Sequence, residues 1–225
     1  MYNRNIQAVL FDLDGTLVNT IGDIAFALNT ALIQAGVPVV DDDTCMSFVG
    51  RGLRNALKNA LDEADHTCSP EELSNLLEIL MATYRAHPAD RSFVYPGIEA
   101  LLKNLVAHGL AIGVLSNKEE SLVLAIVAKL FPGIPFVSVH GMVQGLPGKP
   151  DPSQALAFAS VVGLDPSQVL VVGDSEVDAL LATNAGCPMV LVTWGFRPKQ
   201  TLLQEGYGPL CDTVGELESE VCTCN

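Results

Sequence analysis

Short apolar runs alternate along the chain with segments of helical periodicity. Each run is rich in Val, Ile, Leu or Phe, which is typical of strands that are buried on both faces of a parallel sheet. The runs span residues 8–11, 110–115, 136–139, 169–172 and 189–192. This alternation predicts a Rossmann-like α/β core, with a mostly parallel sheet and helices on both of its faces.

Helical segments fall between these runs, as right-handed crossovers require. Residues 98–107 carry an apolar stripe and stop near Gly109, a plausible C-terminal cap. Asp151 and Pro152 precede residues 153–162, and both residue types are typical of a helix start. The pattern therefore predicts a helix in each of these two segments.

The stretch between the first two predicted strands is much longer than a single crossover helix needs, and it contains no convincing strand. Ser69, Pro70 and Glu72 form a capping-box start for a helix that runs to about Arg85. An amphipathic stripe predicts another helix through Ile24, Leu28, Ala31, Leu32 and Ala35, and residues 41–48 and 52–64 are weaker candidates. We therefore expect an inserted helical subdomain, joined to the core near residues 18–21 and 93–97.

Composition and charge narrow the possible functions. The 225 residues are 49% hydrophobic and 17% charged, so disorder is not expected. The formal net charge of −14 argues against binding to nucleic acid or to an anionic membrane. No apolar run is long enough to span a bilayer, and the N-terminus lacks a signal-peptide pattern, so a cytoplasmic location is expected. The six cysteines are too few for a disulfide scaffold, and the close pair Cys222 and Cys224 is interpreted as unpaired thiols.

Two carboxylates follow the first predicted strand. Asp12 and Asp14 lie on the same side of an extended chain, just past the carboxyl edge of the sheet. Two carboxylates that lie close together repel each other. One of them can therefore keep a proton, or both can bind a divalent cation. The alternative is that both are turn residues before Gly15.

A second acidic pair follows the fourth predicted strand. If a helix starts at Ser175, Asp178 can bend back toward Asp174 and form an oxygen-rich pocket for a hard cation such as Mg²⁺. The alternative is that Asp174 is an N-cap and that the acidic residues after it simply stabilise the first turn of the helix.

Polar residues also follow the second predicted strand. Ser116 and Asn117 are expected at the start of the next helix, where free backbone donors suit an oxyanion, although an ordinary N-cap explains them as well. Lys149 lies between Gly148 and Pro150, a stiff and exposed setting in which it is either an aimed ammonium group or a solvated surface residue. Because the carboxyl ends of parallel strands share one crevice, Asp12, Ser116 and Asp174 are predicted to converge there.

These residues resemble the motifs of the haloacid dehalogenase superfamily, in particular its phosphoglycolate phosphatase-like branch. Four motifs occur in order: Asp12-Leu-Asp14-Gly-Thr16-Leu, Ser116-Asn117, Lys149-Pro150 and Gly173-Asp174-Ser-Glu-Val-Asp178. The resemblance implies an α/β core of residues 1–18 and 95–225 and a mobile four-helix cap of residues 19–94. It also implies a phosphoric monoester hydrolase that acts on a small phosphorylated metabolite as a monomer or homodimer.

The resemblance further implies roles for the motif residues. Asp12 would attack phosphorus and form an aspartyl-phosphate, and Asp14 would protonate the departing alkoxide and later activate water. Mg²⁺ would be held by the Asp12 carboxylate, the Asp14 backbone carbonyl and Asp174, with Asp178 in support. Substrate-binding roles would fall to the remaining motif residues, namely Thr16, Ser116, Asn117 and Lys149.

The expected activity is therefore Mg²⁺-dependent hydrolysis of a small phosphomonoester, with phosphoglycolate as the leading candidate. Dehalogenases of the superfamily lack the second aspartate, so Asp14 favours phosphatase chemistry. A β-phosphoglucomutase-like phosphosugar mutase and a non-catalytic binding module remain alternatives. Arg51, between two glycines of the insertion, can approach a substrate carboxylate or can simply be solvated. The segment Trp194-Gly195-Phe196-Arg197 also resembles this branch, although its aromatic residues can equally pack the sheet edge.

Overall fold

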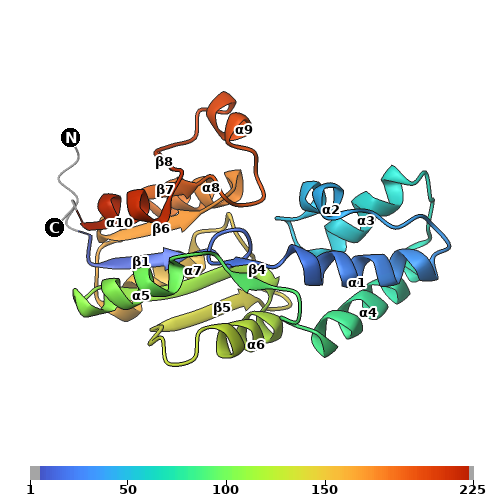
Figure 1. The fold of residues 1–225 in the computed structure, drawn as a ribbon, viewed down its shortest axis with the longest axis horizontal. Helices are drawn as coiled ribbons and strands as arrows, with labels where there is room; N and C mark the ends of the chain where they lie inside the picture. The colour runs from blue at the N-terminus through green and yellow to red at the C-terminus, as the bar shows by residue number, and fades with distance from the viewer. Residues whose placement is uncertain (1–5, 223–225) are drawn as a thin grey trace. The chain divides into compact units, whose positions relative to one another are not determined.

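The computed structural model describes residues 6–222, and the chain divides into two compact units. We call Met1–Val18 with Val94–Asn225 the core unit, and Asn19–Phe93 the helical unit. The chain passes from one to the other at two short strands that pair together, β2 (Val18–Asn19) and β3 (Phe93–Val94). Figure 1 shows the α/β elements of the first unit and the helices of the second.

Within residues 6–222, the core unit is built on a six-stranded sheet with the order β5-β4-β1-β6-β7-β8. Every neighbouring pair runs parallel, so the predicted parallel α/β core is confirmed. The strands are β1 (Ala8–Phe11), β4 (Ala111–Glu119), β5 (Ser138–Met142), β6 (Val169–Gly173), β7 (Met189–Val192) and β8 (Leu210–Cys211). Three details differ from the prediction. β4 continues to Glu119, beyond the predicted end at residue 115, and β5 begins at Ser138 rather than at residue 136. The two-residue β8 was not predicted, because its sequence contains no recognisable apolar run.

The central strand β1 determines where the polar residues meet. Phe11 is level with Val114 of β4 on one side and with Val172 of β6 on the other. All four residues of β1 are buried, because neighbouring strands and helices surround it. The residues that follow these three strands therefore emerge at one carboxyl edge of the sheet, where ligands of open α/β folds bind.

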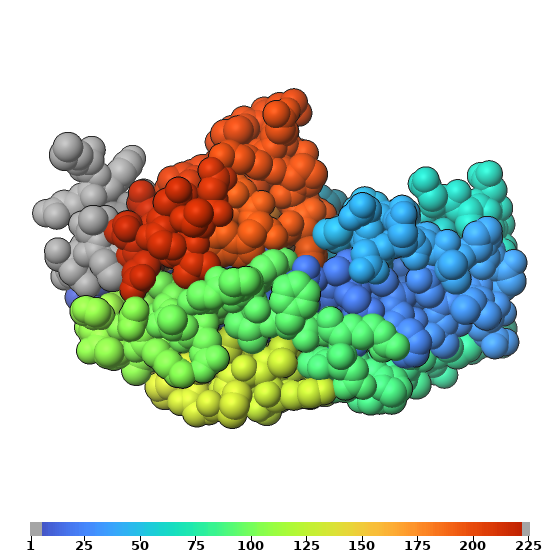
Figure 2. Space-filling model, in the orientation of Figure 1, coloured from blue at the N-terminus to red at the C-terminus, as the bar shows by residue number. Residues whose placement is uncertain are grey.

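Helices cover both faces of this sheet. On one face, Phe158 of α7 (Ser153–Val162) and Leu181 of α8 (Glu176–Ala185) belong to the same buried cluster as Leu10 of β1. On the other face, α5 (Ile98–Ala107) and α10 (Val214–Cys222) lie side by side, and their surfaces meet in Figure 2. The remaining helices are α6 (Glu120–Leu130), the short 3-10 helix Pro166–Gln168 and α9 (Lys199–Gln204).

The helical unit, all of whose residues are described, contains the four helices that the resemblance implied. They are α1 (Ile21–Gln34), α2 (Asp42–Phe48), α3 (Leu53–Glu63) and α4 (Pro70–Ala86). The predicted start of α4 is confirmed, because the Ser69 hydroxyl accepts a hydrogen bond from the Glu72 N–H at 3.1 Å. No helix within residues 6–222 has the length and apolarity needed to cross a membrane.

Candidate active site

The loop after β1 carries Asp12 and Asp14. The Asp12 N–H donates to the Val172 carbonyl at 2.8 Å, so this residue still follows the ladder between β1 and β6. Gly15 then turns the chain with a φ of +83°, a conformation that favours glycine. The two aspartate side chains are only 11% and 13% exposed, so their charges lie in a poorly solvated place.

Asp174 and Asp178 join Asp12 at this edge. One carboxylate oxygen from each of the three residues lies within 4.8 Å of the others. Asp178 bends back as the sequence predicted, because its carboxylate accepts from the Ser175 hydroxyl at 2.6 Å and from the Ser175 N–H at 3.2 Å. Ser175, rather than Asp174, is therefore the N-cap of α8, which leaves the Asp174 carboxylate directed to the cluster.

Lys149 lies inside this acidic cluster. Its Nζ is 2.8 Å from Asp12 Oδ1 and 2.7 Å from Asp178 Oδ1, and its side chain is 4% exposed. The predicted exposed setting was wrong, because the Asn117 side-chain amide donates to the Lys149 carbonyl at 2.9 Å and fixes the loop against the core. Burial alone would lower the pKa of Lys149, but the charges of Asp12 and Asp178 outweigh it and raise that pKa above its ordinary value.

Asp14 has a separate set of partners. The Ser116 hydroxyl donates to Asp14 Oδ2 at 3.2 Å, and the Lys118 ammonium group, which is buried, donates to Asp14 Oδ1. Lys118 was not predicted as a site residue. Residues two apart in an extended strand point to the same side, so its spacing from Ser116 would have indicated it had the strand been expected to reach that far.

The expected helix start at Ser116 and Asn117 was wrong. Both residues lie within β4, and α6 begins only at Glu120. The strand continues because it pairs with β5 across an irregularity in register, as far as Glu119 opposite Met142. Ser116 and Asn117 therefore contribute side chains to the site rather than free amides of a helix N-terminus.

The buried carboxylates repel one another, and this repulsion affects their pKa values. Burial raises the pKa of Asp12 well above its usual range, Lys149 opposes this, and the charges of Asp178, Asp174 and Asp14 add to it. Burial and the charge of Asp178 likewise raise the pKa of Asp174 to about 7, against the lowering effects of the Phe196 N–H, Lys149 and Arg197. The buried site therefore holds more negative charge than its own cations compensate.

The donor set fits a hard divalent cation. Four carboxylates face two ammonium groups, which leaves a formal charge of −2 when all are ionised. Oxygen ligands from carboxylates are those that Mg²⁺ prefers. The carboxylates of Asp12, Asp174 and Asp178 could hold such an ion, and its charge would offset the surplus.

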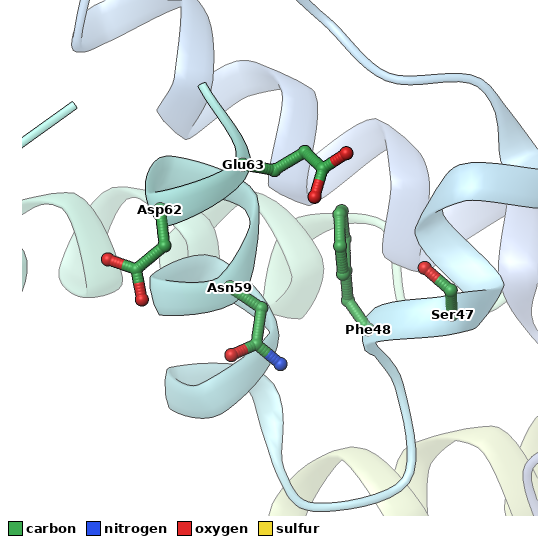
Figure 3. Close-up of a pocket in the computed structure, with 5 residues that line it drawn as sticks. All are labelled: Ser47, Phe48, Asn59, Asp62 and Glu63. Atoms are coloured by element: carbon green, nitrogen blue, oxygen red, sulfur yellow. The ribbon is translucent and has the colours of Figure 1, made fainter. Parts of the chain in front are cut away.

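Two further predicted residues lie apart from these contacts. Thr16 is completely buried, and its Oγ1 has no hydrogen-bond partner in the part of the chain that the structure describes. Arg51 is exposed in the loop between α2 and α3 of the helical unit. A pocket between those two helices contains none of the predicted site residues (Figure 3). It is lined by Ser47, Phe48, Asn59, Asp62 and Glu63.

Comparison with known proteins agrees with the fold. Residues 9–192 match the family described as haloacid dehalogenase-like hydrolase, and the chain belongs to that family. Several of its curated relatives are named phosphoglycolate phosphatases. One of them, the phosphoglycolate phosphatase of Caulobacter vibrioides, is 35% identical over 204 residues, which cover 90% of this chain and 86% of the relative.

Solved structures show the same likeness. A protein from Lactobacillus delbrueckii subsp. bulgaricus superposes with a TM-score of 0.91 at 29% identity, covering 96% of this chain and 98% of the other. A predicted phosphoglycolate phosphatase from Haemophilus somnus has a TM-score of 0.87 at 28% identity, with 98% and 99% of the two chains covered. The likeness thus extends over the whole α/β and helical architecture.

Proposed function

We propose that this protein is a Mg²⁺-dependent phosphatase that hydrolyses a small organic phosphomonoester, with phosphoglycolate as the leading candidate, through an aspartyl-phosphate on Asp12. The observation that carries the proposal is the buried cluster of Asp12, Asp174 and Asp178 around the Lys149 ammonium group. A carboxylate nucleophile and a phosphate dianion repel each other, so the reaction needs concentrated positive charge at this place.

In the first half-reaction, Asp12 attacks phosphorus, its oxygen–phosphorus bond forms, and the bond to the ester oxygen breaks. Asp14 gives its proton to the departing alkoxide. In the second half-reaction, Asp14 takes a proton from water, which attacks phosphorus and releases phosphate and the free Asp12 carboxylate. The bonds from Ser116 and Lys118 support this role, because they orient the Asp14 carboxylate.

The other predicted residues of the core unit bind the phosphoryl group or support the loops of the site in this proposal. Ser116 and Lys149 would hold phosphoryl oxygens, Asn117 would fix the Lys149 loop, and Thr16 would support the loop that carries Asp14. When bound, Mg²⁺ would supply charge neutralisation at the phosphoryl group. The ion would be held by the carboxylates of Asp12 and Asp174 and by the Asp14 backbone carbonyl, with Asp178 in support.

The substrate assignment rests on the names of the relatives and on Arg51. A small acid phosphate such as phosphoglycolate has a carboxylate, and we propose that Arg51 of the helical unit, acting as a cap, binds it. We further propose that the protein acts in the cytoplasm as a monomer or homodimer. In this proposal residues 1–18 and 95–225 form the catalytic core, and residues 19–94 form the cap.

A substrate panel tests the proposal. Phosphate release is measured from phosphoglycolate, glycerol phosphate, glucose 1-phosphate and glucose 6-phosphate, each with Mg²⁺ and with a chelator. We expect release only with Mg²⁺ and the highest kcat/KM for phosphoglycolate. Full turnover of every active substrate in chelator would contradict the proposal. Conversion of glucose 1-phosphate to glucose 6-phosphate without phosphate release would establish the mutase instead, and no turnover of any substrate would favour a binding module.

A further inference from the structure

The segment after β7 contacts both loops that carry the acidic residues. The Trp194 indole N–H donates to the carbonyl of Thr16, in the loop after β1, at 3.2 Å. Two residues later, the Phe196 N–H donates to Asp174 Oδ2, in the loop after β6, at 2.6 Å. One short segment thus bridges two loops that lie far apart in the sequence.

Gly195 brings this segment into direct contact with the carboxylate. A Cβ atom at Gly195 would lie 2.3 Å from both Cβ and Oδ2 of Asp174, and 2.5 Å from the Gly15 carbonyl oxygen. A Cβ atom at Gly15 would likewise lie 2.4 Å from Asp174 Oδ2. Two glycine backbones therefore contact the Asp174 side chain closely, and a Cβ atom at either position would require that side chain to shift.

The segment is itself anchored at both ends. The Trp194 ring lies against the Tyr95 ring, with centroids 6.4 Å apart, and the Tyr95 N–H donates to the Leu17 carbonyl at 3.2 Å. At the other end, Arg197 Nε is 3.0 Å from a carboxylate oxygen of Glu176, the first residue of α8. These contacts hold the bridge rigidly against the loops on either side of it.

We propose that Trp194, Gly195 and Phe196 are positioning residues that fix the orientation of Asp174 and its distance from the loop of Asp12 and Asp14, and so set the affinity for the divalent cation. The inference rests on the proposed function in taking the acidic cluster as the cation site. Without the bridge, a buried carboxylate beside Asp12 and Asp178 would turn away from them, because like charges repel. Groups that orient a metal ligand affect metal binding although they never touch the ion.

Two variants test this inference. Gly195→Ala adds only the crowding Cβ, because Gly195 is not among the glycines with positive φ and its backbone suits alanine. Trp194→Phe keeps an aromatic ring and removes the N–H donor to Thr16, together with the second ring of the indole. The matched control is Gly215→Ala, since a Cβ at Gly215 has no heavy atom within 4 Å.

Binding of Mg²⁺ is measured by titration calorimetry and binding of Mn²⁺ by electron paramagnetic resonance, both on the substrate-free protein. Gly195→Ala should raise the Kd for Mg²⁺ by about tenfold to hundredfold, the range seen when supporting contacts of a metal ligand are lost. Trp194→Phe should raise it by about fivefold, as expected for loss of one hydrogen bond. Both variants should change the bound Mn²⁺ spectrum, and Gly215→Ala should change neither quantity.

A folded Gly195→Ala protein with the unaltered Kd and Mn²⁺ spectrum would overturn the inference. If that variant does not fold, Trp194→Phe alone decides, and an unchanged Kd there has the same meaning. Absence of saturable Mg²⁺ or Mn²⁺ binding by the unaltered protein would also overturn it. If the unaltered protein binds Mg²⁺ but releases no phosphate from any ester, the proposed function fails, while the Kd values still decide the positioning role.

Discussion

Both units bury an aspartate, but the two environments differ in how the charge is satisfied. In the helical unit, Asp23 of α1 is 1% exposed, and its two carboxylate oxygens each accept from the Arg91 N–H at 3.0 Å. The Ser92 hydroxyl donates to it at 2.5 Å, and the Arg91 guanidinium group is 3.9 Å away. The carboxylate of Asp23 is thus satisfied by protein donors without any further ion.

The acids of the core unit also accept hydrogen bonds, but their negative charges outnumber the ammonium groups beside them. Asp12 and Asp178 share one ammonium group, and the pKa of Asp174 is raised to about 7 by burial and by Asp178. Burial of an acid therefore does not by itself indicate a functional site. A surplus of buried negative charge does, because it persists only where a ligand or a proton offsets it.

The largest expected effect is that of Asp12→Asn, which should abolish catalysis without lowering the stability of the fold. Asp12→Asn should lower phosphate release by on the order of 10³-fold or more, because the amide is a poor nucleophile of nearly the same volume. Its melting temperature in the absence of metal should be equal or higher, since one charge of the crowded cluster is removed. Steady-state kinetics and calorimetry check both parts, and unaltered turnover would refute the nucleophile assignment.

The next effect concerns pH and metal in the core unit. The pKa of Asp174 is raised from 3.8 to about 7, so the folded, metal-free protein keeps a proton that the unfolded chain loses. Stability should therefore fall by a few kcal/mol as the pH rises from about 4 to about 7. Mg²⁺ should raise the melting temperature more at about pH 8 than at about pH 5.5. At the lower pH the metal must first displace the proton from Asp174, whereas at the higher pH that carboxylate is already ionised. Melting curves with Mg²⁺ and with chelator test this, and equal shifts at the two pH values would contradict it.

A smaller effect is expected for Asp23, the hydrogen-bonded aspartate of the helical unit. Asp23→Asn places an amide group against backbone and hydroxyl donors, which should lower the free energy of unfolding by about 1–3 kcal/mol. The kcat for phosphate release, measured well below the melting temperature, should stay near that of the unaltered protein. Denaturant unfolding and kinetics measure the two quantities, and a loss of kcat like that of Asp12→Asn would erase the contrast between the units.

The smallest effect is expected at Arg51. Arg51→Ala should raise KM about threefold to tenfold for phosphates that carry a carboxylate, and leave KM for neutral alkyl phosphates nearly unchanged. Arg54→Ala, which alters a nearby exposed arginine of α3, is the control. Equal changes in KM for both substrate classes would remove Arg51 from the substrate site.

Local patterns in the sequence predicted most of the architecture. The runs that became β1 and β7 were located to the residue, and the helices α5 and α7 matched their predicted bounds. These elements could be predicted because their signals are apolar periodicity and capping residues, which act between neighbours in the chain. The acidic cluster was predicted for a related reason, since the edge at which parallel strands end is common to all of them.

Contacts between distant residues were decided only by the tertiary structure. No local pattern indicates that Lys149 is buried between Asp12 and Asp178, that β4 continues far enough for Lys118 to reach Asp14, or that the Gly195 backbone contacts the Asp174 side chain. Each depends on which loops meet when the sheet is assembled, and on how far a strand such as β4 continues through its pairing with β5. The sequence by itself determined which acids reach the edge of the sheet, whereas the packing of the loops determined how their charges are balanced, because that balance acts through space rather than along the chain.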